Sequence, residues 1–217
     1  MALMQKDSRP LFPVDVAGWP FIGTAAALAA LAAGVAGFWS ATPFLALAVV
    51  FLFFFRDPER TSPNDPSAVL SPADGRVLMA GPADESAPSG AWLQVSIFLS
   101  PLDVHVNRVP VSGIVTQVTF RRGRYLPAYR RDAGSTNECS EVWVDHHGQP
   151  VVFRQVVGVL ARRVVCRLQK GREVEAGARF GVMKFGSRMD VFLPLTATLC
   201  VSAGDRVIGG ETVLARM

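Results

Sequence analysis

The sequence predicts a mainly β protein of the α+β class, in which a β-sandwich or barrel-like domain follows an N-terminal hydrophobic helical hairpin. Two observations lead to this prediction. Residues 16–55 contain no Asp, Glu, Lys or Arg. After residue 56 the chain changes to short apolar runs that are broken at close intervals by Gly, Pro and Asp, a pattern typical of β domains.

The uncharged window is long enough for two helices, because a helix that spans a membrane needs about 20 apolar residues. Gly37, Ser40 and Pro43 lie near its centre and favour a break there. We therefore expect one helix over Trp19–Phe38 and a second, shorter helix over Pro43–Phe55. Three arrangements stay open: a double crossing, a re-entrant or interfacial hairpin, and a buried core hairpin.

Positive charge flanks only the outer ends of this hairpin. Lys6 and Arg9 precede it, Arg56 and Arg60 follow it, and the central turn carries no charge. The positive-inside rule then predicts that both ends face the cytoplasm. We expect a membrane-associated unit over residues 1–56 and a second domain over residues 57–217.

The second domain begins with the Pro- and charge-rich linker "RDPERTSPNDPS". The stretch 125–138, "YLPAYRRDAGSTNE", is the longest irregular piece and is expected to be a functional loop. The stretch 155–168, "QVVGVLARRVVCRL", fits either a strand or a short helix. Strand-like runs occupy residues 75–81, 92–100, 104–111, 113–120, 140–148, 150–158 and 189–195.

Charge and cysteine usage limit the partners. The net charge is +4, and basic residues gather in "RRGRYLPAYRR" (121–131) and "LARRVVCRLQKGR" (160–172). Beside a membrane segment, these clusters favour an anionic lipid surface as partner. Nucleic acid is not expected, because no recognition motif accompanies the charge. The three cysteines show no C-x-x-C spacing, which argues against a zinc site or a disulfide framework, so no metal is expected.

Three residues could together carry out nucleophilic chemistry. Asp74 in "SPADGRV" offers a carboxylate, His105 in "PLDVHVNRVP" a general base, and Ser187 in "MKFGSRMDV" a hydroxyl nucleophile. Such triads are defined by geometry and not by chain order. Taken singly, each residue also fits a plain structural role, as a turn residue or a satisfied core histidine. The pair His146–His147 is expected to lie in a solvated turn.

Several motifs occur together in a characteristic order. They are "FFFRDPER", "SPADGRV", "FLSPLDVHVNRVP", Asn137–Glu138, "QVVGVLARR" and "FGVMKFGSRMDVFLP". Taken as an ordered set, they resemble the phosphatidylserine decarboxylase proenzymes, in particular the short form with a membrane hairpin. The resemblance runs from the hairpin to the last strand. The tail "VSAGDRVIGGETVLARM" also resembles the strand–turn–strand of lipoyl-type sandwiches.

The resemblance implies a self-processing enzyme. Cleavage between Gly186 and Ser187 would give a β chain of residues 1–186 and an α chain of residues 187–217, which stay together as a heterodimer. Ser187 would become a covalent pyruvoyl cofactor, with His105 as the base and Asp74 as its partner. The reaction would convert phosphatidylserine in the membrane to phosphatidylethanolamine and CO₂ through a Schiff base, at the cytoplasmic face of the cell membrane. A homo-oligomer is left open.

The sequence departs from the larger relatives at two places. They carry H-x-x-H where this chain reads "HVNR", so Arg108 replaces the second histidine, and they carry "LGST" where it reads "FGSR". Arg108, Asn137 and Glu138 are candidates for binding the substrate; an arginine fork suits a phosphate.

Three alternatives compete with this interpretation. The first is a membrane-tethered Ser/His/Asp hydrolase, and the second is a decarboxylase of a related serine phospholipid. The third, a lipoyl-like module, is disfavoured because "GDRVIGGETV" lacks the lysine that such a module carries.

Overall fold

The computed structural model of the protein describes residues 13–159, 164–184 and 186–217. The chain forms two compact units that divide between Glu59 and Arg60. The boundary expected after residue 56 lies just before this division.

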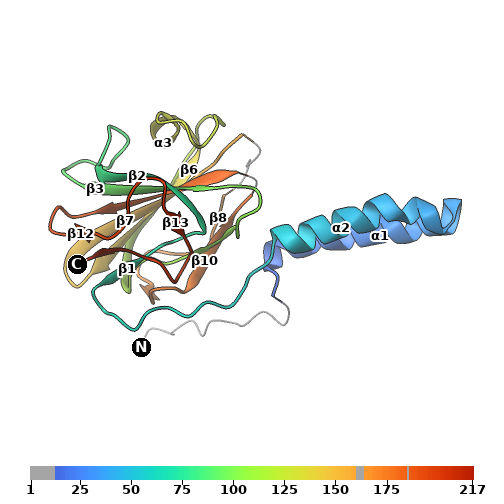
Figure 1. Ribbon diagram of the computed structural model, residues 1–217, viewed down its shortest axis with the longest axis horizontal. Coiled ribbons are helices and arrows are strands. Elements are labelled where there is room, and N and C mark those ends of the chain that lie inside the picture. The colour runs from blue at the N-terminus through green and yellow to red at the C-terminus, as the bar shows by residue number, and fades with distance from the viewer. Residues whose placement is uncertain (1–12, 160–163, 185) are drawn as a thin grey trace. The chain divides into compact units, whose positions relative to one another are not determined.

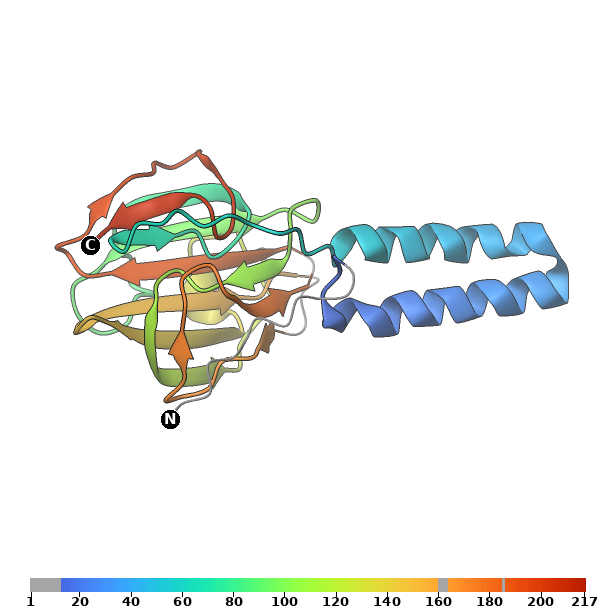
Figure 2. The same ribbon diagram turned by 90° about the horizontal axis from the view of Figure 1, so that it is seen from below.

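The N-terminal unit is the expected pair of apolar helices, α1 (Trp19–Ala36) and α2 (Thr42–Phe54), which run antiparallel side by side in Figure 2. The short 3-10 turns η1 (Val16–Gly18) and η2 (Phe38–Ala41) precede each helix. Gly37 ends α1 with a positive φ of 86°, a conformation that a glycine adopts without strain. The expected break at this point is confirmed.

Small residues let the two helices approach closely. Ala25 and Ala29 of α1 and Ala48 of α2 are buried, whereas large apolar side chains such as Val35 and Val49 are exposed. A helix that is apolar all round suits an apolar solvent. Among the described residues, one segment, Val16–Ala36, is long and apolar enough to cross a membrane, and Phe38–Phe54 is a shorter apolar segment. This composition supports membrane association.

The second unit is built on one large antiparallel sheet (Figure 1). Its strands follow the order β13-β2-β3-β11-β7-β6-β5-β9. Register shifts interrupt β2 between Val77 and Met79, and β5 between Val115 and Gln117. Such bulges increase the local twist and help a sheet to curl. The strands are β2 (Gly75–Pro82), β3 (Leu93–Leu99), β5 (Gly113–Arg121), β6 (Cys139–His146), β7 (Gln149–Val156), β9 (Glu173–Val174), β11 (Ser187–Leu193) and β13 (Arg206–Val207).

Two three-stranded sheets complete this unit. One has the order β1-β14-β12 and the other β4-β10-β8. The core holds Ile97 and Met189 of the large sheet, Phe180 of β10 and Leu214 of β14. Together with the apolar helix pair, this curled β architecture confirms the predicted mainly β class. The bounds are β1 (Ala68–Leu70), β4 (Val106–Arg108), β8 (Val164–Cys166), β10 (Arg179–Met183), β12 (Thr198–Leu199), β14 (Val213–Arg216) and the short helix α3 (Ala133–Thr136).

The sequence-predicted strands at residues 75–81, 92–100, 113–120, 140–148, 150–158 and 189–195 correspond to β2, β3, β5, β6, β7 and β11. The run 104–111 contains only the short β4. The ambiguous stretch 155–168 ends β7 and forms β8, and its residues 160–163 lie outside the described residues.

One row of paired residues crosses the large sheet and defines its two ends. In order from β2 to β5, the row is Arg76, Phe98, Arg188, Val156, Cys139 and Arg121. We call the end beyond this row the Ser187 end, because Ser187 and its partner Leu99 are the next pair outward. The opposite end, where Leu193 pairs with Leu93, is the Leu193 end.

Candidate active site

Ser187 is the first residue of β11 and is completely buried. Side chains alternate between the two faces of a strand, so Ser187 shares a face with Met189 and Val191, which belong to the core. Its Oγ has no hydrogen-bond partner among the described residues. A buried hydroxyl without a partner is unfavourable and calls for an explanation beyond packing.

The bond between Gly186 and Ser187 lies where the chain passes from one sheet to another. β10 ends at Met183 in a small sheet, and β11 begins at Ser187 in the large sheet. Gly186 has a φ of +67°, and no atom would contact a Cβ placed on it. Backbone conformation, and not lack of space, therefore explains the glycine, since the left-handed region disfavours other residues.

Gly158 lies against the carbonyl group of Gly186. The register that pairs Arg188 with Val156 continues to bring residue 158 opposite residue 186. A Cβ on Gly158 would lie 1.9 Å from the Gly186 carbonyl oxygen, far inside any permitted contact. The sequence analysis did not identify Gly158 as a site residue, although it lies in the motif "QVVGVLARR". A glycine that ends an apolar strand was the signal that could have revealed it.

Asn137 and Glu138 hold the segment that leads to Gly158. The buried Asn137 donates from Nδ2 to the carbonyl oxygens of Leu126 and Val157, both at 2.8 Å. Its Oδ1 accepts from the Leu126 amide at 3.0 Å. The Val157 amide donates to the Glu138 carbonyl oxygen at 3.1 Å. Both residues thus support the backbone beside Gly186, and their role in binding substrate stays a prediction.

His105 lies in the segment that connects β3 to β4 and is almost fully buried. Its Nδ1 is 2.9 Å from the Asp103 carbonyl oxygen. Its own carbonyl oxygen accepts a hydrogen bond from the Met183 amide at 3.2 Å, which ties His105 to the last residue of β10. The same segment starts at Leu99, the strand partner of Ser187. The segment of His105 is therefore connected to the chain on both sides of the Gly186–Ser187 bond: to Met183 before the bond by a hydrogen bond, and to Ser187 after it through Leu99.

Asp74 lies at the Ser187 end, immediately before β2. Its Oδ2 accepts from Arg60 Nη2 at 2.7 Å, and its Oδ1 accepts from the Gly209 amide at 2.8 Å. Through Asp74, these two bonds connect Arg60, where the chain enters the β unit, with Gly209 in the C-terminal tail. The proposed role of Asp74 as the partner of His105 stays a prediction.

Arg108 is buried at the end of β4. Its Nη1 donates to the Gly177 carbonyl oxygen at 3.0 Å, and its backbone amide donates to Pro72 at 2.9 Å. The side chain therefore joins β4 to the turn before β10. Its assignment as a phosphate ligand also stays a prediction.

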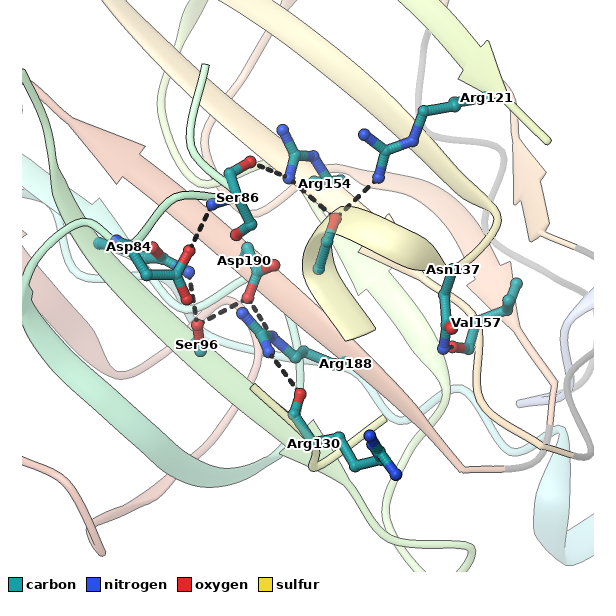
Figure 3. A network of polar contacts seen from close by, with 12 residues as sticks. Asp84, Ser86, Ser96, Arg121, Arg130, Asn137, Arg154, Val157, Arg188 and Asp190 are labelled. Carbon is teal, nitrogen blue, oxygen red and sulfur yellow. Dashed lines mark hydrogen bonds and ion pairs between the residues drawn. The ribbon is translucent and has the colours of Figure 1, made fainter. Parts of the chain in front are cut away.

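A buried ion pair anchors β11 directly after Ser187 (Figure 3). Arg188 Nε lies 2.5 Å from Asp190 Oδ1, and both side chains are buried on the face opposite Ser187. Ser96 donates to the same carboxylate oxygen at 2.7 Å. Arg188 also donates from Nη1 to the Arg130 carbonyl oxygen at 3.2 Å. Strand β11 is thus fixed to the neighbouring strand β3 and to the loop 122–132. Sequence reasoning missed this pair, because isolated charges in a strand usually indicate a solvated face.

A second buried arginine belongs to the same network. Arg154 of β7 binds Glu141 through Nη2 at 2.5 Å and donates from Nη1 to the Ser86 carbonyl oxygen at 2.8 Å. It also reaches the Gly134 carbonyl oxygen, which accepts from Arg121 Nη2 at 2.7 Å. These bonds fasten α3 and the β2–β3 loop onto the outer face of the sheet (Figure 3).

The described residues contain no group of three or more side chains suited to hold a metal ion. Burial raises the pKa of the Cys139 thiol and that of the Cys166 thiol, so thiolate chemistry is disfavoured at both. Ser86 Oγ is also buried without a partner among the described residues, but Ser86 follows Glu85, whereas Ser187 follows a glycine in the left-handed region. Of the groups described, the Ser187 hydroxyl is therefore the best candidate for a reactive group.

Comparison with known proteins identifies the family of this chain. Residues 47–215 match the family described as "Phosphatidylserine decarboxylase". Three relatives are each named phosphatidylserine decarboxylase proenzyme. The protein of Pelodictyon phaeoclathratiforme is 47% identical over 78% of this chain and 81% of its own. That of Chlorobium limicola is 42% identical over 92% and 97%, and that of Desulfotalea psychrophila 39% over 96% and 99%. The chain belongs to the phosphatidylserine decarboxylase family.

Proposed function

We propose that this chain decarboxylates phosphatidylserine to phosphatidylethanolamine, using a pyruvoyl group that it makes from Ser187 by cutting its own Gly186–Ser187 bond. The observation that carries the proposal is the buried Ser187 Oγ, which has no hydrogen-bond partner among the described residues and directly follows a glycine in the left-handed region. The names of the relatives, which call them proenzymes, support self-processing.

Processing requires that the Ser187 Oγ attack the carbonyl carbon of Gly186. The acyl group then moves from nitrogen to oxygen, the amide C–N bond breaks, and the nitrogen takes the proton that the hydroxyl gives up. Loss of the Ser187 α-proton expels the Gly186 carboxylate, and water releases the nitrogen as ammonia and leaves a ketone. A base must take the hydroxyl proton. His105 is our candidate, because its chain segment is bound to both Met183 and the strand that pairs with Ser187.

The two products would stay together without a covalent bond. β11 pairs with β3 on one side and with β7 on the other, and β14 pairs with β1. Residues 187–217 therefore supply a central strand of the large sheet. Buried strands with two hydrogen-bonded neighbours are among the last parts of a protein to open.

The residues at the site fit a small ketone at position 187. Such a group supplies an electron sink for decarboxylation of an amine substrate. The chain contributes a water-poor site at the end of β11, and His105 is our candidate to return a proton to the substrate carbon. We further propose that the apolar helix pair holds the enzyme at the cytoplasmic face of the cell membrane, where its lipid substrate lies.

Intact mass of the purified protein tests the proposal. We expect two chains divided at Gly186–Ser187, with the smaller chain lighter by one ammonia than hydrolysis alone would give. Ser187→Ala should remain whole, while Ser140→Ala, which removes a buried serine from β6, should still be cut. A wild-type protein that stays whole but hydrolyses esters would instead support the Ser/His/Asp hydrolase. Assays with other serine phospholipids then decide the substrate.

A further inference from the structure

We infer that the Ser187 end of the large sheet is the surface with which the β unit docks on an anionic bilayer. This inference rests on the proposed function and names how the site meets its substrate. The docking surface consists of the loops beyond the row that contains Arg188. Among the described residues, its exposed members include Leu102, Arg122, Arg124, Tyr129, Arg131 and Val159.

Three exposed side chains with apolar surface lie in the loops at this end of the sheet. Leu102 is 71% exposed at the tip of a tight turn, in which the Leu102 amide donates to Ser100 Oγ. Val159 is 53% exposed and follows Gly158, the neighbour of Gly186. Tyr129 is 62% exposed, with its ring centroid 6.1 Å from that of Phe98 in the row. Apolar tips and a tyrosine next to basic residues are typical of surfaces that enter a membrane interface.

The charge of the two ends differs in sign. The loop from β5 to β6 at the Ser187 end carries four arginines against Asp132 and Glu138. The loops and strand ends at the Leu193 end carry a net negative charge: Asp84, Glu85, Asp145, Glu173 and Glu175 against Lys170 and Arg172. Arginines near an anionic surface are attracted to it, whereas the Leu193 end would be repelled.

The chain also enters the β unit at the docking surface. Arg60 binds Asp74, which precedes β2 at the Ser187 end. Five residues separate Arg60 from Phe54, the last residue of α2, and a chain of that length reaches at most about 21 Å. A bilayer that holds the apolar helices therefore lies within reach of this end of the sheet.

Docking at this end would let the reactive group meet a lipid headgroup without removing the lipid from the bilayer. The acyl chains would stay in the hydrocarbon, and only the headgroup would approach residue 187. This arrangement avoids exposure of two acyl chains to water, which is strongly unfavourable.

Two matched cysteine variants of the full chain test the inference. Leu102→Cys and Leu195→Cys, each in a Cys200→Ser background, would carry an environment-sensitive fluorophore. Leu195 is 61% exposed and follows Leu193 at the opposite end of β11, so the apolar helices anchor both labels equally. The vesicles contain phosphatidylcholine with or without phosphatidylglycerol, plus a lipid with a quencher high on its acyl chain.

We expect the label at position 102 to be quenched, more strongly with phosphatidylglycerol, and the label at 195 to stay in water. Arg122→Gln/Arg124→Gln should lower the docked-to-undocked ratio about 25-fold, or about fivefold for each arginine. Lys170→Gln/Arg172→Gln removes the same charge from the Leu193 end and should leave this ratio unchanged. Equal quenching at both positions, or a label at 102 that stays in water, overturns the inference.

The same measurement on Ser187→Ala separates this inference from the proposed function. Quenching does not require a processed enzyme, so a chain that docks but is never cut would refute only self-processing. A chain that is cut and active but does not dock through position 102 would refute only the docking surface.

Discussion

Replacement of Gly158 by alanine should slow self-cleavage about 100-fold while the protein still folds. The new Cβ would lie 1.9 Å from the Gly186 carbonyl oxygen, whereas real Cβ atoms essentially never come within 3.0 Å of another heavy atom. The carbonyl must therefore move by at least about 1.1 Å. Misplacement of a reacting group by about 1 Å can lower a rate about 100-fold, or about 2.7 kcal/mol in activation free energy.

The assay follows the fraction of cut chain with time after synthesis, by intact mass, beside urea unfolding of the same samples. Gly113→Ala is the matched control, because its Cβ would meet the Asp145 carbonyl oxygen at 2.2 Å, but at the Leu193 end. Both variants should lose about 1–3 kcal/mol of stability through overpacking. If Gly158→Ala is cut as fast as Gly113→Ala, the carbonyl of Gly186 does not need its observed position and the reasoning is refuted.

Two further predictions concern buried groups. Arg188→Met leaves the Asp190 carboxylate buried without its cation, and we expect a loss of about 3–5 kcal/mol in unfolding free energy. Arg154→Met should destabilise the protein by a similar amount. Of the two variants compared at matched stability, only Arg188→Met should slow self-cleavage, because only Arg188 adjoins Ser187. Equal cleavage rates in the two variants would contradict this prediction. Burial raises the pKa of Cys139 and so lowers its thiolate fraction at any given pH, while Cys200 is exposed. Iodoacetamide at pH 8 should therefore label Cys200 in the folded protein and Cys139 only after unfolding in urea, as peptide mass mapping would show.

Sequence reasoning predicted most of the elements correctly, because their signals are local. An uncharged window with Gly37 at its centre is enough to specify two apolar helices and their turn. Alternating apolar residues likewise identify β3, β7 and β11. The order of the motifs pointed to the family and to the Gly186–Ser187 bond, and the comparisons confirmed the family.

The site itself was only partly predictable. Strand register is a relation between segments far apart in the chain, so no local pattern indicated that Gly158 would face Gly186. The buried pair of Arg188 and Asp190 was also missed, since a charge is buried only where the fold supplies a partner. The structure adds that Asn137 clamps Val157, while its predicted role in binding substrate stays a prediction.

The sequence by itself therefore determined what each segment is made of: an apolar helix pair, a set of short strands, and a glycine–serine bond within a family motif. Only the tertiary structure decided that this bond lies where the chain changes sheets, with the Ser187 hydroxyl in the core and Gly158 against the Gly186 carbonyl. Composition and periodicity act over a few residues. The surroundings of Ser187 depend on the pairing of strands β3, β7 and β11, which the whole β unit fixes at once.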